Sequence, residues 1–526
     1  MPNEAINGHV IMKNIQLLDC TLRDGGYYTN WDFDIDSVNT YIESFNHLPV
    51  SYLEIGYRSN PMKEYLGEYF YLPEYVLRRI KEQSNKKLAV ILNEKDVRAA
   101  HAESLLSPCK PYIDLVRIAV APDNFERALS LGEAVKKLGF EVSFNVMYMS
   151  EWENNPGLMS LIPSVNGIVD FFYLVDSFGG VFPEDVKKSI ALIRSRTDVK
   201  LGFHGHNNLE MALSNTLTAI DEGIDIVDAT ITGMGRGAGN LKMELLLTVL
   251  NSQNKLDFDY NWLSKVTDVF SELQREYEWG PNLPYMVSGA NSIPQKQVME
   301  WVSKRFYSFN SIIRALTNQS KGIKDNQKLP SLKFDEKKYA DALIIGGGPT
   351  AVRHAEAINE LLKKNPDMVV IHASSKNALN FQNIENDQFF CLVGNEGYRL
   401  ETVFNKSEVK GRCILPPYPR KMGTYIPRAL TEKAYELTEV NFTDNYFDSH
   451  TSLALQTAID LKVDNIFVVG YDSYSDSKMG EKEIELVTEN EYLFNKADQN
   501  LRGSIQSITP TRYTELAQSN IYSLLS

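Results

Sequence analysis

Histidine, cysteine and long apolar runs are all scarce in this chain. Its 526 residues include 8 histidines and 4 cysteines, and Cys20, Cys109, Cys391 and Cys413 lie far apart without a Cys-x-x-Cys pair. This spacing matches neither a zinc ribbon nor a disulfide framework, and it fits a reducing compartment. No apolar run approaches the roughly 20 residues that span a bilayer, and the first residues lack a signal-sequence pattern. We therefore expect a cytoplasmic protein with no membrane partner.

Positive charge is also in deficit. The formal net charge is -14, from 54 Lys and Arg against 68 Asp and Glu, and the basic residues form no strong cluster. This balance argues against a nucleic-acid or anionic-membrane surface, although a local site could still bind a small anion. The hydrophobic content of 43% and the length leave ample material for a core and predict two or more domains.

Short apolar runs alternate with longer helix-like stretches through the first half of the chain. Eight runs fit β-strands, at residues 16–19, 52–56, 88–92, 114–120, 141–147, 171–176, 200–206 and 225–231. Eight βα units of this length match a closed (β/α)₈ barrel, with an open doubly wound sheet as the rival. We predict a barrel over residues 1–254.

The rest of the sequence, after residue 254, predicts a helical extension and a second α/β domain. Residues 255–330 show helical spacing of apolar residues and could mediate homo-oligomer formation, and the polar stretch 317–338 is typical of a linker. A Rossmann-like domain is predicted over 331–526, where "ADALIIGGGPT" (340–350) fits a strand followed by a glycine turn. Gly346, Gly347 and Gly348 are its candidate cofactor-binding residues. The third glycine and the acidic residue expected for a nicotinamide dinucleotide are missing.

Two histidines stand one residue apart in "LGFHGHNNLE" (201–210), at the end of a predicted strand. Side chains two apart on a strand point the same way, so His204 and His206 could face one metal ion, although such a pair is weak evidence alone. The first strand continues into "LLDCTLRDGGYY" (17–28), which brings Arg23 and Asp24 and two glycines that predict a tight turn. In a barrel both strands open onto the C-terminal face, so Asp24 could complete a two-histidine, one-carboxylate set.

Other polar residues follow other strands. Glu54 lies at the end of the second strand, Asp176 and Ser177 lie in "VDSFGG" (175–180) after the sixth, and Asn240 ends "TGMGRGAGN" (232–240) after the eighth. Each one singly fits a cap, a turn or a buried hydrogen bond, but their shared placement predicts a substrate site. The glycines of the last segment could let backbone N–H groups approach an anion.

At these positions the chain resembles a known superfamily. "LLDCTLRDGG" resembles the D-x-T-L-R-D-G signature and "HGHNN" the H-x-H-N signature of the metal-dependent aldolases, lyases and synthases that include 4-hydroxy-2-oxovalerate aldolase, HMG-CoA lyase and isopropylmalate synthase. "VDSFGG" and "GMGRGAGN" are similar to the segments after strands six and eight in that group. The resemblance covers residues 14–250 and is strongest to 4-hydroxy-2-oxovalerate aldolase.

The resemblance implies a metal centre and a chemistry. Asp24, His204 and His206 would be the ligands of a divalent ion, with Mn²⁺ or Mg²⁺ expected from the oxygen and nitrogen donors and Co²⁺ or Zn²⁺ as alternatives. Arg23 would hold an enolate oxygen.

The resemblance also suggests how substrate is held. Ser177 would lie near the carboxylate of a 2-oxo acid, and Asn240 would be close to the site. One position departs from the pattern, because Tyr27 stands where these aldolases carry a histidine proposed as the acid/base. A phenol with an ordinary pKa of about 10 is a poor base near neutrality, so the base is left open.

Three functions follow as alternatives. The first is an aldolase joining a pyruvate-type enolate to an aldehyde, and the second is a CoA-ester lyase or Claisen-type synthase of the same superfamily. The third is an inactive barrel carrying a C-terminal nucleotide-sugar-binding or glycosyltransferase domain. It rests on the faint resemblance of "GGGPT" and residues 449–474 to sialyltransferase-like domains, which hints at carbohydrate biosynthesis.

Overall fold

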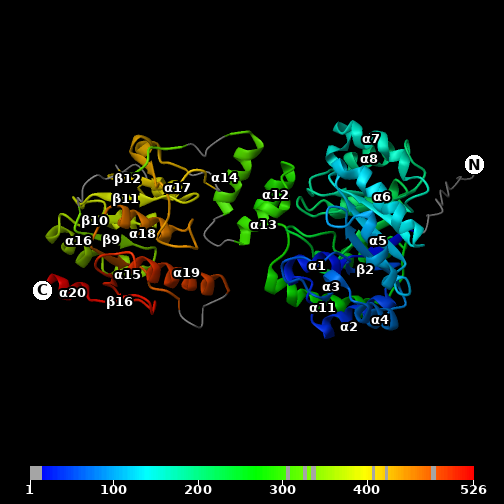
Figure 1. Cartoon of the computed structure of the whole chain (residues 1–526), viewed down its shortest axis with the longest axis horizontal. Coiled ribbons are helices and arrows are strands. Elements are labelled where there is room, and N and C mark those ends of the chain that lie inside the picture. The colour runs from blue at the N-terminus through cyan, green and yellow to red at the C-terminus, as the bar shows by residue number, and fades with distance from the viewer. Residues whose placement is uncertain are drawn as a thin grey trace, which may run out of the picture. The chain divides into compact units, whose positions relative to one another are not determined.

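A computed structural model describes residues 15–303, 309–323, 328–332, 339–404, 409–420, 425–474 and 481–526. The chain forms two compact units, Met1–Glu300 and Trp301–Ser526. The division between them lies inside the predicted helical extension. Figure 1 shows the helices and strands of both units.

The first unit is a closed barrel of eight parallel strands. The strands are β1 (Gln16–Asp19), β2 (Tyr52–Tyr57), β3 (Lys87–Asn93), β4 (Leu115–Val120), β5 (Glu141–Val146), β6 (Phe171–Asp176), β7 (Lys200–Gly205) and β8 (Ile226–Ala229). Closure comes from β1 pairing with β8, with Leu18 opposite Asp228. The predicted barrel is confirmed, and the open-sheet alternative is wrong for this unit.

Helices cover the outside of the barrel. They include α2 (Ile35–His47), α4 (Glu74–Gln83), α5 (Ala99–Leu106), α6 (Phe125–Lys137), α8 (Pro183–Arg194), α9 (Ala212–Asp221) and α10 (Met243–Ser252), with the shorter α3 (Glu68–Tyr71) and α7 (Pro156–Leu161). Because strands of such a barrel are buried on both faces, they are apolar almost throughout, and all six residues of β6 are buried.

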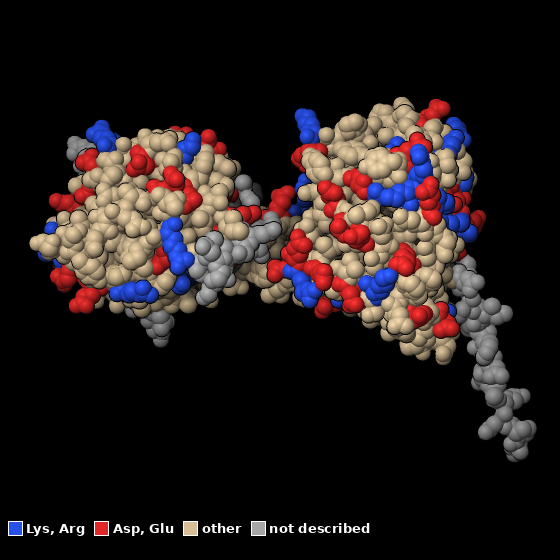
Figure 2. All heavy atoms as spheres, turned by 90° about the horizontal axis from the view of Figure 1, so that it is seen from below, with Lys and Arg blue, Asp and Glu red and all other residues tan. Residues whose placement is uncertain are grey.

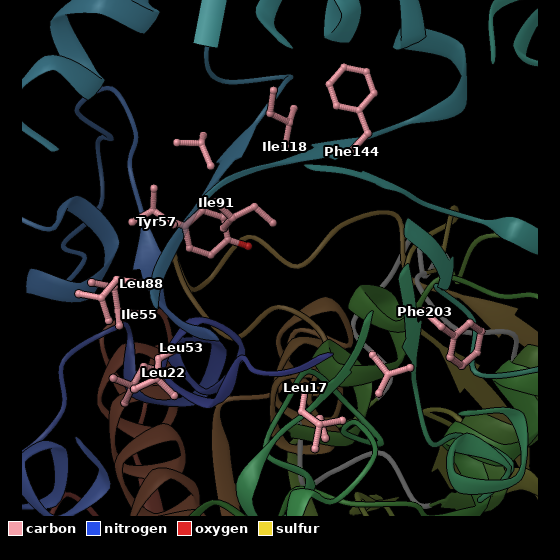
Figure 3. Packing of buried hydrophobic residues seen from close by; sticks show 14 of the residues in the cluster. Leu17, Leu22, Leu53, Ile55, Tyr57, Leu88, Ile91, Ile118, Phe144 and Phe203 are labelled. Atoms are coloured by element: carbon pink, nitrogen blue, oxygen red, sulfur yellow. The ribbon is translucent and has the colours of Figure 1, made fainter. Parts of the chain in front are cut away.

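The alternation of side chains along each strand decides which residues can form a site. Leu17, Leu53, Leu88 and Phe203 belong to the apolar cluster between the strands and the helices (Figure 3). Since successive residues of a strand point to opposite faces, the neighbours of such residues point into the barrel. His204 is therefore directed inward.

The segment after β1 is helical. Residues Thr21–Thr29 form α1, so the tight turn expected from Gly25 and Gly26 is wrong. The glycines are needed for close packing instead, because a Cβ on Gly25 would collide with Met234 and one on Gly26 with the ring of Trp31. The helix places Arg23 and Asp24 in its first turn, where both are buried.

Four helices lie in the described part of the predicted helical stretch. They are α11 (Tyr260–Tyr277), α12 (Leu283–Ala290), α13 (Gln295–Ser303) and α14 (Phe309–Ser320). The predicted linker over 317–338 begins too early, because its first four residues complete α14. Residues 324–327 and 333–338 of that linker lie outside the described residues.

The second unit is a parallel sheet of eight strands in the order β13-β12-β11-β10-β9-β14-β15-β16. The strands are β9 (Asp341–Ile345), β10 (Val369–His372), β11 (Gln388–Cys391), β12 (Arg412–Leu415), β13 (Ala434–Glu436), β14 (Asn465–Val469), β15 (Ile505–Ser507) and β16 (Ala517–Gln518). Besides α14, the described part of this unit contains the helices α15 (Pro349–Arg353), α16 (Ala355–Lys364), α17 (Glu396–Phe404), α18 (His450–Asp460), α19 (Glu481–Asp498) and α20 (Ile521–Leu525). The strand order reverses at β9, which makes the carboxyl ends of β9 and β14 a topological switch point.

The surface carries both signs of charge. On the face shown in Figure 2, acidic and basic side chains are interspersed over both units, without a large basic area. Within the described residues, no helix combines the length and apolarity that crossing a membrane requires.

Candidate active site

Asp24 lies at the centre of a buried polar cluster at the mouth of the barrel. Its Oδ1 pairs with the Arg23 guanidinium, and its Oδ2 accepts a hydrogen bond from Asn240 Nδ2 at 2.7 Å. The same Oδ2 lies 3.7 Å from Nε2 of His204. Burial alone would raise the pKa of Asp24, but the charge of Arg23 and then of His204 outweigh it and lower the pKa. Asp24 is therefore an anionic carboxylate.

The two histidines are each held through Nδ1. His204 Nδ1 lies 2.9 Å from Oδ2 of Asp228, and His206 Nδ1 lies 2.7 Å from the main-chain oxygen of Asp176. A carbonyl oxygen only accepts, and burial lowers the pKa of His206 to about 3, so His206 is neutral with its proton on Nδ1. In both rings Nε2 has no hydrogen bond to another described residue, which is how metal-binding histidines are commonly prepared.

The ligand atoms of Cys20, Asp24 and His204 all lie within 4.8 Å of one another. His206 is not a member of this tight group, but its ring lies 5.0 Å from that of His204 at 86°. Burial raises the pKa of the Cys20 thiol well above its ordinary value, and its Sγ contacts the carbonyl oxygen of Ala229 at 3.7 Å. Cys20 is therefore a neutral thiol beside the Asp24 and His204 pair.

A charge network inside the barrel supports this cluster. Arg117 is fully buried and donates from Nη1 to Glu54 at 2.8 Å and from Nη2 to Asp228. Glu54 Oε2 also accepts from Nε of Arg23 at 2.8 Å. Burial would raise the pKa of Asp228, yet the charge of Arg117 and the hydrogen bond from His204 lower it. Glu54, predicted as a substrate-binding residue, lies between two guanidinium groups.

The loop after β6 positions its polar residues in two ways. The Asp176 carboxylate accepts hydrogen bonds from the backbone of Gly180 at 3.2 Å and Val181 at 3.4 Å, and burial raises its pKa to about 6. Ser177 is half-buried, and its Oγ accepts from the backbone N–H of Tyr148 at 2.9 Å. The Asp176 side chain thus organises its own loop, while its backbone carbonyl orients His206.

The glycine-rich loop after β8 brings Asn240 to the cluster. Asn240 forms an antiparallel bridge with His206, and its Oδ1 is buried without a hydrogen-bond partner among the described residues. Gly235 is close to this amide, since a Cβ there would lie 2.5 Å from Nδ2. The backbone N–H of Gly239 donates within the loop to the carbonyl of Arg236 at 3.1 Å. These glycines therefore serve close packing around Asn240.

Tyr27 lies one helical turn after Asp24. Its hydroxyl is 3.1 Å from that of Tyr57, and its ring contacts the edge of Trp31 with centroids 5.0 Å apart. The guanidinium of Arg236 stacks on its ring at 3.9 Å. Burial raises the pKa of Tyr57 well above its ordinary value, so Tyr57 is a neutral phenol.

Gly346, Gly347 and Gly348 lie in the second unit, at its switch point. They line a cavity of about 440 Å³ together with Lys376, Arg399, His450 and Asp472, among others. The N–H groups of Gly346 and Gly348 already donate to the carbonyls of Val469 and Gly470, each at 2.8 Å.

The Asp472 carboxylate closes the start of the short helix α15. Its Oδ1 accepts from the Thr350 N–H at 3.1 Å and its Oδ2 from the Thr350 hydroxyl at 3.0 Å. The amides that a phosphate would use are thus largely engaged within the protein.

The sequence analysis did not single out Asp228, Tyr57 or Arg236. Asp228 had a usable signal, a carboxylate within the apolar strand "DIVDATI" (225–231), because a charge in a buried strand requires a partner. Tyr57 and Arg236 had none, since their contacts with Tyr27 depend on how α1 packs against the end of β2 and against the loop after β8.

Comparisons with known proteins agree with this geometry. A family model described as HMGL-like matches residues 14–270. An oxaloacetate decarboxylase from Mycobacterium tuberculosis is 28% identical over 318 residues, covering 58% of this chain and 92% of that protein. A 4-hydroxy-2-oxovalerate aldolase from Geobacillus thermodenitrificans is 29% identical over 248 residues, covering 45% of this chain and 70% of that protein.

A solved structure matches over the same half of the chain. It is the N-terminal domain of a "putative aldolase" from Bacteroides vulgatus, 54% identical with a TM-score of 0.55, and it covers 57% of this chain and 100% of that one. Through residues 14–270, the chain belongs to the HMGL-like family.

Proposed function

We propose that the protein is a divalent-metal-dependent aldolase, a lyase that forms or cleaves a carbon–carbon bond between a pyruvate-type enolate and an aldehyde. The observation that carries the proposal is the pair of histidines with Nδ1 occupied and Nε2 free beside the anionic Asp24. The aldolase and decarboxylase relatives support the same class of reaction.

The residues present fit a divalent cation. Asp24, His204 and His206 would hold it, and the unpartnered Oδ1 of Asn240 is a further oxygen donor nearby. Oxygen and imidazole donors suit Mn²⁺ or Mg²⁺, with Co²⁺ and Zn²⁺ also compatible. Cys20 would not supply a thiolate, because burial favours its neutral form.

The proposed chemistry depends on the residues around that centre. A bound cation would supply Lewis-acid stabilisation of negative charge on the keto oxygen, an effect worth several kcal/mol. Arg23, held in place by Glu54, provides a fixed positive charge beside Asp24 where the enolate oxygen would develop. The Ser177 hydroxyl is proposed to bind the carboxylate of the 2-oxo acid.

The proton at C3 of the 2-oxo acid needs a carrier. The Tyr27 hydroxyl is our candidate, because it is paired with the Tyr57 hydroxyl and lies one turn from Asp24 on α1. The Arg236 guanidinium lies over its ring, with Cζ 3.9 Å from the ring centroid.

Proton exchange at C3 of pyruvate tests the proposal without the aldehyde. EDTA-treated protein in D₂O should lose the exchange, followed by NMR, and regain it with Mn²⁺. The His204→Ala variant should lose it as well, whereas His47→Ala, at the exposed end of α2, should retain it. Exchange that persists in His204→Ala would contradict the assignment.

A related reaction has support of its own. Decarboxylation of oxaloacetate gives the same enolate, and the oxaloacetate decarboxylase relative covers 58% of this chain. Pyruvate release from a 4-hydroxy-2-oxo acid would favour the aldolase, carbon dioxide release from oxaloacetate the decarboxylase, and thiol release from acetyl-CoA the synthase alternative.

The nucleotide-sugar site of the second unit stays a prediction. Its support is a cavity of about 440 Å³ at the switch point, lined by Lys376 and Arg399. The engaged amides of Gly346 and Gly348 imply that side-chain cations, more than the glycine loop, would bind a phosphate there.

A further inference from the structure

Arg236, at the barrel mouth, is a cation without a polar partner in the part of the chain that the structure describes. It lies in the loop between β8 and α10 and is half-buried. Among the described residues its side chain makes no hydrogen bond or ion pair, and its defined contact is the stacking of Cζ 3.9 Å from the Tyr27 ring centroid. Partly buried guanidinium groups are usually paired, so this one is free to bind an anion from outside the chain.

Stacking makes Arg236 a prepared binding group. The Tyr27 ring lies against the guanidinium and limits its movement, while the N–H groups of the planar fork remain available. This fork matches a carboxylate or phosphate through two parallel hydrogen bonds. Arg23 and Arg117, in contrast, are both engaged by buried carboxylates.

The position of Arg236 relates it to the candidate metal centre. Its loop also carries Asn240, which donates to Asp24 at 2.7 Å. Tyr27, whose ring the guanidinium covers, lies one helical turn after Asp24 on α1. An anion on Arg236 would therefore lie near Tyr27, whereas the keto acid is proposed to lie beside Arg23.

We propose that Arg236 binds an anionic group of the aldehyde, so that the acceptor of the reaction carries a carboxylate or a phosphate. This inference rests on the proposed aldolase function. It names the class of the second substrate, which neither the barrel fold nor the ligand set specifies.

The test compares charged and neutral aldehydes of similar length, with pyruvate and Mn²⁺ in the full chain. Succinic semialdehyde is compared with butanal for a carboxylate, and glyceraldehyde 3-phosphate with glyceraldehyde for a phosphate. The readout is the ratio of kcat/KM for the charged aldehyde to that for the neutral one. The pair with the larger ratio in the unaltered protein identifies the anion.

In Arg236→Gln this ratio should fall by about 30-fold, as expected when a charge-assisted hydrogen-bond pair is lost. Arg236→Lys keeps the charge but lacks the paired N–H groups of the guanidinium, so the ratio should fall less in this variant. It decides the test if the glutamine variant does not fold. Arg275→Gln removes an exposed arginine from α11 and should leave the ratio unchanged.

The outcomes separate this inference from the proposed function. An active Arg236→Gln protein with an unchanged ratio overturns the role of Arg236 and leaves the aldolase standing. A large rise in KM for pyruvate, measured by C3 proton exchange, would assign Arg236 to the keto acid and overturn the acceptor assignment. Absence of metal-dependent exchange in the unaltered protein overturns both.

Discussion

Replacing Asp228 with asparagine should weaken divalent-cation binding by about 10- to 100-fold. Asp228 contacts no proposed substrate atom, and it acts through His204, whose Nδ1 lies 2.9 Å from its Oδ2. The same oxygen accepts a hydrogen bond from Arg117. Asparagine keeps the shape and removes the charge that both partners require.

The magnitude follows from these contacts. A hydrogen bond to a charged group contributes about 1.5–3 kcal/mol, and its loss leaves His204 free to rotate or to change tautomer. Arg117 keeps its bond to Glu54, so this arginine retains one of its two ion pairs. The variant should therefore fold with reduced stability and bind the cation with a reduced affinity of the stated size.

Isothermal titration with Mn²⁺ measures the affinity, and circular dichroism verifies that the variant is folded. Asp221→Asn, at the exposed end of α9, is the matched control because it removes the same charge away from the barrel mouth. If a folded Asp228→Asn variant binds Mn²⁺ with an affinity within twofold of the unaltered protein, Asp228 does not orient His204 as a metal ligand.

Two further substitutions test groups that bind a proton. Burial raises the pKa of Asp19 to about 7, above its unfolded value of 3.8. The folded form binds this proton more tightly, so deprotonation of Asp19 should lower the unfolding free energy by about 3 kcal/mol between pH 4 and pH 7. Asp19→Asn should lack that fall in urea titrations across this range, and an identical pH profile would count against it. Tyr27→Phe should slow pyruvate C3 exchange by at least about 100-fold if its hydroxyl carries the proton. Tyr28→Phe, the control, should change the rate little. An unaffected exchange rate in Tyr27→Phe would place the base elsewhere.

The barrel strands were predictable because burial on both faces leaves a local trace. The run "FFYLVD" (171–176) shows apolar, β-rich composition in six consecutive residues, and it forms β6 within the same bounds. The conformation of α1 was not predictable, because Gly25 and Gly26 also fit a turn. Their need for close packing depends on Met234 and Trp31, and no local pattern records that contact.

The candidate site likewise contains residues that the sequence predicted and contacts that it did not. Asp24 and His204 stand in short motifs at strand ends, and the fold brings them together. The support for His204 from Asp228 depends on the pairing of neighbouring strands, and the contact of Arg236 with Tyr27 depends on how a loop folds back over α1. The strand order of the second unit was likewise beyond the sequence, because parallel strands joined by crossovers can be arranged in several orders.

The hydrogen bonds that orient His204 and His206 differ in how much they depend on the amino acid that supplies the acceptor. The acceptor for His206 is a main-chain oxygen, which every residue type at position 176 would supply. The acceptor for His204 is a carboxylate at position 228, which a single codon change can remove. In a library of random variants, the orientation of the His206 ring should therefore tolerate replacement of Asp176. The orientation of the His204 ring should depend on the carboxylate of Asp228.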